Sequence, residues 1–79
     1  MSTKQKINNI FHNTFCLKKE YIKPSTDIFR DLGFPTPLEM ELVEELEKTF
    51  EIRIKDKEWD FETLTIQEIN NFINSKLNK

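Results

Sequence analysis

Two side chains near the start of the sequence have the chemistry of a catalytic or metal site. His12 and Cys16 are four residues apart, a spacing that puts two side chains on one face of a helix. A cysteine nucleophile also needs an organised base and a cavity, and a zinc ion needs further ligands. The sequence offers neither beside this pair. We therefore expect an exposed histidine, a half-buried cysteine, no metal site and no enzymatic activity.

The middle of the chain is rich in carboxylates. Residues 31–51 include seven acidic residues and one base, a local charge of −6 in a chain whose net charge is −2. This asymmetry favours a partner with a basic patch and argues against nucleic acid, whose phosphates would be repelled. The alternative is a plain solvated helix surface. The residues expected to contact a partner are Glu39, Glu41, Glu44, Glu45 and Glu47.

The third feature is Thr36, which stands between Pro35 and Pro37. Proline suits the first position of a helix, where its missing N–H costs nothing, so Thr36 becomes the predicted N-cap, with Glu39 three residues later. Such a cap contributes about 1 kcal/mol. Helix capping is therefore a sufficient reason for the threonine.

Three amphipathic helices are predicted around these residues. Apolar side chains recur at steps of three and four residues over 4–16, 37–50 and 65–76. Capping boxes are expected at two of the helix starts: Ser2 with Gln5, and Thr65 with Glu68.

The two longer connections differ in character. Residues 17–35 include two prolines and the only glycine, Gly33, but they are also rich in apolar side chains. We expect this long loop to pack across the helices. Residues 51–64 have room for one short helix that opens near Asp56, and a strand there would have no partner. The predicted fold is therefore all-α and forms one domain over residues 1–79.

Composition narrows the class of protein. A single cysteine cannot form an internal disulfide, and a single glycine rules out a Gly-rich phosphate loop. No apolar run approaches the roughly 18 residues of a membrane span, and the polar start lacks the apolar region of a signal peptide. We expect a soluble, cytoplasmic protein that does not insert into membranes.

The order of these features resembles the acyl carrier protein family over essentially the whole chain. The matching features are a D-L-G turn at 31–33, a hydroxyl three residues after the glycine, an E-L-V acidic helix that ends in Phe50, an Ile-x-Ile-x-Asp connection at 52–56, and a last helix that begins T-I-Q at Thr65. The resemblance implies a four-helix bundle of three main helices, one short helix and a long ordered loop.

In that family, the serine of a D-S-L motif is joined to 4′-phosphopantetheine by a transferase that uses coenzyme A, and the thiol of the arm carries acyl groups as thioesters. Here the same positions read Pro35, Thr36 and Pro37, so only the hydroxyl is retained. Thr36 is the candidate attachment residue. One alternative is a working carrier in fatty-acid, polyketide or related biosynthesis. The others are an interaction or regulatory module without the arm, and a diverged helical module with an unrelated partner.

The resemblance also implies partners and a cavity. Carrier proteins dock through the acidic helix on basic patches of synthases, acyltransferases and phosphopantetheinyl transferases, and Glu41 and Glu47 stand where the motif has acids. We expect a monomer that docks in this way. In a domain this small, we expect the residues that would line an acyl cavity to fill a core when no ligand is bound. These candidates are Val43, Leu46, Phe50, Ile54, Trp59, Phe61 and Ile69.

Overall fold

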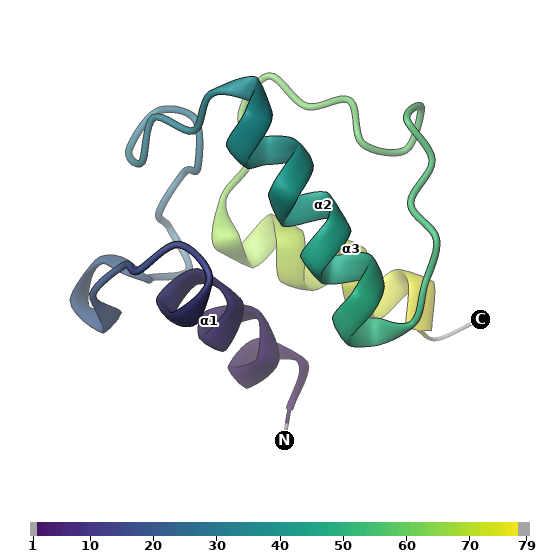
Figure 1. Cartoon of the computed structure of the whole chain (residues 1–79), viewed down its shortest axis with the longest axis horizontal. Coiled ribbons are helices and arrows are strands. Elements are labelled where there is room, and N and C mark those ends of the chain that lie inside the picture. Colours follow the sequence, from purple (N-terminus) through teal and green to yellow (C-terminus); the bar gives the residue numbers. More distant parts are fainter. Residues whose placement is uncertain (1, 78–79) are drawn as a thin grey trace.

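The computed structural model describes residues 2–77, and this part of the chain is helical (Figure 1). It contains three α-helices and one short 3₁₀ turn: α1 (Thr3–Asn13), η1 (Lys19–Tyr21), α2 (Thr36–Phe50) and α3 (Ile66–Leu77). Within the described residues there is no strand, only one isolated antiparallel bridge between Asp27 and Thr65. The predicted all-α class is therefore confirmed.

The start of α1 is capped as predicted, but the helix is shorter than expected. Ser2 Oγ accepts a hydrogen bond from the Gln5 backbone N–H at 3.2 Å, and the Gln5 side chain accepts one from the Ser2 N–H at 3.1 Å. The helix ends at Asn13 and not at Cys16, which has a left-handed φ of 56°. A left-handed residue ends a helix and reverses the chain. The reversal places the Phe15 ring 4.9 Å from that of Phe34, centroid to centroid.

The start of α3 also matches its predicted capping box. The Glu68 backbone N–H donates to Thr65 Oγ1 at 3.1 Å, and the Thr65 N–H donates to Glu68 Oε1 at 2.9 Å. Both boxes depend only on residues three apart, which is why the sequence is enough to predict them.

The short helix predicted near Asp56 is a single turn, so a fourth α-helix is absent from residues 2–77. The Trp59 N–H donates to the carbonyl oxygens of Lys55 and Asp56 at 3.1 and 3.2 Å, and the chain then leaves the helical path. One turn fixes several backbone dihedrals for very few hydrogen bonds, so it does not propagate without further helical residues. The chain instead runs as an irregular segment to Leu64.

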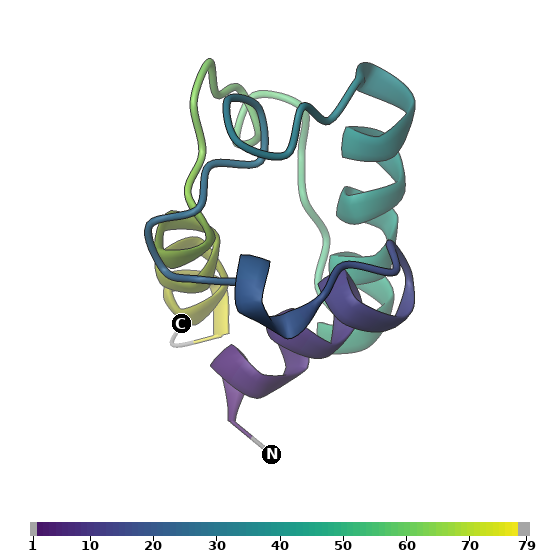
Figure 2. The ribbon, with the colours of Figure 1, turned by 90° about the vertical axis from the view of Figure 1, so that its left-hand side faces the viewer.

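The helices share one core. In Figure 2, α2 and α3 stand on opposite sides of the molecule with α1 beneath them, and loop segments cross the top. Helix α1 contacts both of the others. The side chains with no solvent exposure come from all three helices and from two loops: Ile7, Phe11, Ile28, Leu42, Leu46, Leu64, Ile69 and Ile73.

The loop between α1 and α2 is packed, as its apolar residues predict. Its organising residue is Asp27, which is buried and whose Oδ1 accepts the backbone N–H groups of Phe29 and Arg30 at 2.8 and 2.9 Å. Asp27 Oδ2 accepts the N–H of Leu64, just before α3, at 3.1 Å. The Ile28 N–H donates to the Leu64 carbonyl at 2.9 Å. These bonds join the loop that leads into α2 to the segment that leads into α3.

Candidate functional site

Thr36 is the first residue of α2 and not its N-cap, so the predicted capping role is wrong. Pro35 is the N-cap, and its carbonyl accepts the N–H groups of Leu38 and Glu39, each at 3.0 Å. The helix therefore begins one residue earlier than Pro37 suggested, and Pro37 occupies the second position. No side chain makes a capping hydrogen bond at this end of α2.

The Thr36 side chain consequently has no part in capping the helix. The residue is exposed, and its hydroxyl has no hydrogen-bond partner within residues 2–77. Both flanking prolines are exposed as well. Thr36 and the two prolines thus lie on the surface of the molecule.

The two prolines also reduce the number of backbone N–H groups that the start of α2 can donate to an anion. A helix N-terminus binds phosphate through N–H groups that lack an intrahelical partner. Pro35 and Pro37 have no N–H, and the Leu38 and Glu39 N–H groups already donate to the Pro35 carbonyl. Among residues 35–39, only the Thr36 N–H is left for a bound anion. A phosphate on Thr36 would receive one backbone hydrogen bond there at most.

A groove lies beside α2 one turn after Thr36. It has a volume of about 330 Å³ and runs between the helix and residues 54–59. That volume is at the lower end of the roughly 300–1,000 Å³ typical of small-molecule pockets. Glu39 and Met40 line the groove. They follow Thr36 by three and four residues, so all three residues share one face of the helix. A group attached at Thr36 would therefore be next to it.

The groove has an apolar wall and a charged rim. Met40, Val43, Ile54 and Trp59 provide the apolar surface. The charged residues at its edge are mostly acidic: Glu39, Glu44, Glu47, Lys55 and Asp56. The sequence analysis does not name Met40, which the structure shows to be 60% exposed. The sequence feature that could have identified it is a large apolar residue among the glutamates on the polar face of the helix.

Only some of the predicted cavity residues line the groove. Val43, Ile54 and Trp59 line the groove. Leu46 and Ile69 have no solvent exposure, Phe50 is buried, and all three belong to the main core. Phe61 is half-buried and packs against Trp59. Ile54 and Trp59 are themselves buried and belong to the same core, so the groove and the core share part of the predicted set.

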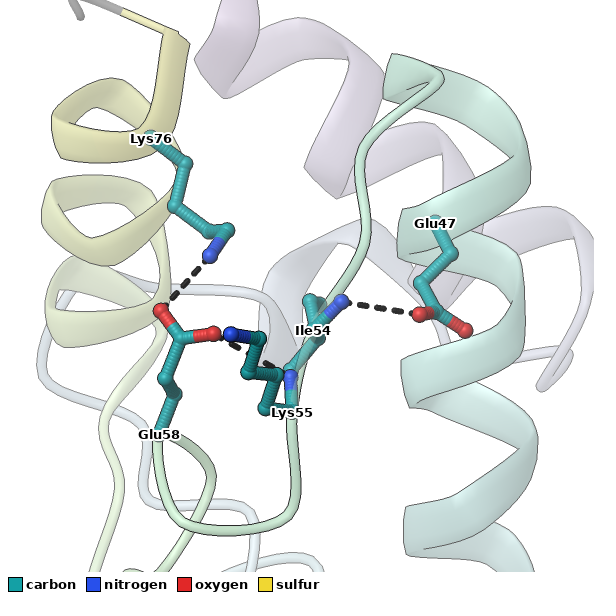
Figure 3. Close-up of polar contacts among 5 residues, drawn as sticks. All are labelled: Glu47, Ile54, Lys55, Glu58 and Lys76. Carbon is teal, nitrogen blue, oxygen red and sulfur yellow. Dashed lines mark hydrogen bonds and ion pairs between the residues drawn. The ribbon is translucent and has the colours of Figure 1, made fainter.

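The acidic face of α2 is not uniform. Glu41 and Glu44 are exposed, whereas Glu39, Glu45 and Glu47 are partly buried. Glu47 Oε2 accepts the Ile54 backbone N–H at 2.8 Å (Figure 3). This bond ties the segment after α2 back to the helix, so Glu47 positions one wall of the groove as well as adding charge to its rim.

The other side of this segment is tied to α3. Lys76 Nζ lies 2.6 Å from Glu58 Oε2, and Glu58 Oε1 accepts the Lys55 backbone N–H at 3.2 Å (Figure 3). The hydrogen bond from Lys76, followed by that from the Lys55 backbone, lowers the pKa of Glu58 from its ordinary value. Both bonds favour the ionised carboxylate.

His12 and Cys16 do not form a site. His12 Nδ1 lies 2.8 Å from the Leu17 carbonyl oxygen, and Cys16 is exposed and not half-buried as expected. The early end of α1 is the reason, because it removes the shared helix face. No group of three or more potential ligands for a metal ion occurs within residues 2–77. None of the described helices is long and apolar enough to cross a membrane.

Comparison with known proteins gives no assignment. No protein-family model matches the chain, and no curated protein matches it.

Proposed function

We propose that this protein is a small carrier of the acyl carrier type, in which the Thr36 hydroxyl bears 4′-phosphopantetheine. The observation that carries the proposal is the exposed hydroxyl without a partner at the start of α2, one turn from the groove. A capping role would have explained the threonine without any further function, and Thr36 makes no such bond.

In this proposal each part of the site has a separate task. Thr36 holds the arm, whose thiol would carry the acyl group as a thioester. Met40, Val43 and Ile54 offer the cargo an apolar surface. The exposed carboxylates of Glu41 and Glu44 attract enzymes with basic docking patches, such as synthases, acyltransferases or the transferase that loads the arm. Docking by charge favours fast and transient encounters, as a carrier requires.

The experiment that tests attachment is the intact mass of the full chain. It is measured after incubation with coenzyme A and a broad-specificity phosphopantetheinyl transferase, and on protein purified from its own host. We expect an increase of one phosphopantetheine group, mapped to Thr36 by peptide fragmentation. Thr36→Val, which keeps the shape and removes the hydroxyl, should show no increase. A serine carrier modified in parallel controls for transferase activity.

A second candidate function is an interaction module that docks through α2 without an arm. The observation in its favour is the Pro35–Thr36–Pro37 sequence, which leaves one backbone N–H for a phosphate at this helix start. Proline also restricts the backbone that a transferase must engage. An unchanged mass under both conditions would select this function. Thr36→Ser then separates the causes, because continued failure of the serine variant would implicate the prolines.

A further inference from the structure

Another pocket lies between residues 52–58 and the end of α3. It has a volume of about 440 Å³ and is lined by Ile52, Arg53, Lys55, Glu58 and Lys76. This volume is within the range of roughly 300–1,000 Å³ that is typical of small-molecule pockets. Three of the lining residues are cationic and one is acidic, whereas the rim of the groove beside α2 is mostly acidic. The segment after α2 therefore separates two hollows of opposite charge.

The positive charge of this pocket is only partly balanced. Lys76 Nζ lies 2.6 Å from Glu58 Oε2, so this carboxylate balances one ammonium group (Figure 3). Arg53 and Lys55 form no ion pair within residues 2–77. Asp56, the acidic neighbour of Lys55, lines the groove on the other side of the segment. Three cations less one carboxylate leave a net charge of +2 on the lining.

Such an excess of one charge favours an anionic ligand. Cations that line the same pocket repel one another, and an anion between them would relieve this repulsion. Part of the lining is already held in place. The Lys76 side chain is only 15% exposed, and Glu58 Oε1 accepts the Lys55 backbone N–H at 3.2 Å. Order that exists before binding lowers the entropy cost of binding a ligand.

The charge and the shape of the lining select a phosphate monoester among anions. A phosphate monoester carries roughly two negative charges at neutral pH, which matches the net charge of the pocket. The guanidinium group of Arg53 has the planar arrangement of donors that binds two phosphate oxygens at once. Ile52 is half-buried and offers apolar surface to an organic group. A carboxylate or a phosphodiester carries a single charge and would leave one cation unbalanced.

We propose that this pocket binds a small soluble phosphate monoester, with Arg53, Lys55 and Lys76 around the phosphate and Ile52 against the organic group. The pocket is separate from Thr36 and from the groove beside α2, so the proposal goes beyond the carrier function and does not depend on it. A concave site of this volume suits a compact soluble ester better than a head group in a flat membrane surface.

The test is an NMR titration of the ¹⁵N-labelled full chain that follows the backbone amide resonances of residues 52–58. The probes are phenyl phosphate, methyl phenyl phosphate, benzoate and inorganic phosphate, at constant ionic strength and above the second pKa of the monoester, which is about 6. Methyl phenyl phosphate and benzoate keep the ring but carry one charge. We expect phenyl phosphate to bind about fivefold more tightly than either, as one further charge near an exposed cation allows. Inorganic phosphate should also bind more weakly, because it has no group to contact Ile52.

Two substitutions should change the affinity for phenyl phosphate in opposite directions. Arg53→Gln should weaken binding about tenfold, because it removes a charged donor. Glu58→Gln should strengthen binding about fivefold, because it removes the carboxylate of the lining. Arg30→Gln, at an exposed arginine outside the pocket, is the matched control and should leave the affinity unchanged. All three positions are exposed, so these variants should fold.

The outcomes that would overturn the proposal are specific. They are the absence of saturable shifts with phenyl phosphate, equal affinities for phenyl phosphate and benzoate, and equal effects of Arg53→Gln and Arg30→Gln. Vesicles that contain phosphatidic acid, whose head group is also a phosphate monoester, test a lipid source by co-sedimentation. Binding to these vesicles without binding of phenyl phosphate would overturn the proposal as well. None of these results depends on whether Thr36 is modified, so this inference and the carrier function can fail separately.

Discussion

At the scale of the residue, the role of Thr36 was decided by the carbonyl group of its neighbour. Pro35 accepts the first N–H groups of α2, so the threonine side chain is left without a task in the fold. A hydroxyl in this state contributes little to stability. The proposed attachment of phosphopantetheine would give it a function, and the mass experiment tests that directly.

Asp27 is the residue whose loss should damage the fold most among the polar side chains. It is 7% exposed, and its carboxylate accepts three backbone N–H groups from the two segments that precede α2 and α3. Asp27→Ala should lower the free energy of unfolding by about 2–4 kcal/mol, because one buried and two partly buried N–H groups would lose their acceptor. Urea denaturation measures this change.

A graded series makes the Asp27 prediction sharper. Asp27→Asn keeps Oδ1 for Phe29 and Arg30 but replaces the acceptor of the Leu64 N–H, so its loss should be smaller than that of alanine. Asp60→Ala, at an exposed aspartate, should stay within about 0.5 kcal/mol of the wild-type protein. Equal stability of Asp27→Ala and Asp60→Ala would contradict the role assigned to Asp27.

At the scale of the element, the segment from residue 51 to residue 64 shapes the groove without forming a helix. Bonds from both neighbouring helices hold it: Glu47 of α2 on one side and Lys76 of α3 on the other (Figure 3). The groove is therefore a product of side-chain contacts between elements. Its width should respond to changes at these contacts more than to changes within either helix.

The Glu58–Lys76 pair predicts a dependence of stability on pH. Because its bonds lower the pKa of Glu58 in the folded protein, ionised Glu58 stabilises the fold above the unfolded-state pKa. That contribution is lost as the pH falls through the lowered folded-state pKa. Thermal unfolding of wild-type protein and Glu58→Gln should therefore differ near neutral pH and converge in acid. Glu62→Gln, at an exposed glutamate, is the matched control, and a constant difference across this range would contradict the prediction.

At the scale of the whole molecule, charge is distributed unequally. Residues 31–51 carry seven of the 14 acidic residues but only one of the 12 basic residues, although the chain as a whole is close to neutral. Glu41 and Glu44 are exposed, so they are available to a partner. Glu47 is bonded within the fold, so its variants would confuse docking with stability.

Reversal of the exposed charges tests docking. The Glu41→Lys, Glu44→Lys double variant should lower the association rate with the phosphopantetheinyl transferase by about tenfold at low salt, and the difference should fade at high salt. Surface plasmon resonance over a salt series measures both effects. A double variant of exposed residues elsewhere, Glu20→Lys with Glu62→Lys, should change the rate less. If both pairs behave alike, the acidic face has no special role.

The sequence by itself determined the three helices and two of their caps. The Ser2–Gln5 and Thr65–Glu68 boxes join residues three apart, and the apolar stripes follow the helical period, so local information is sufficient. The predicted end of α1 was three residues too late, and the predicted start of α2 was one residue too late. There a left-handed residue and a proline carbonyl decided the boundary, and neither follows from periodicity.

Only the tertiary structure decided the site. The Asp27 carboxylate accepts a hydrogen bond from the Leu64 N–H, 37 residues away in the sequence. The Glu47 carboxylate accepts one from the Ile54 N–H, beyond the end of its helix. Tertiary packing likewise decides that Val43, Ile54 and Trp59 line the groove, whereas Leu46, Phe50 and Ile69 lie in the core that Ile54 and Trp59 also share. No local pattern encodes such pairings, because they depend on how the helices pack and on which backbone groups the packing leaves without a partner.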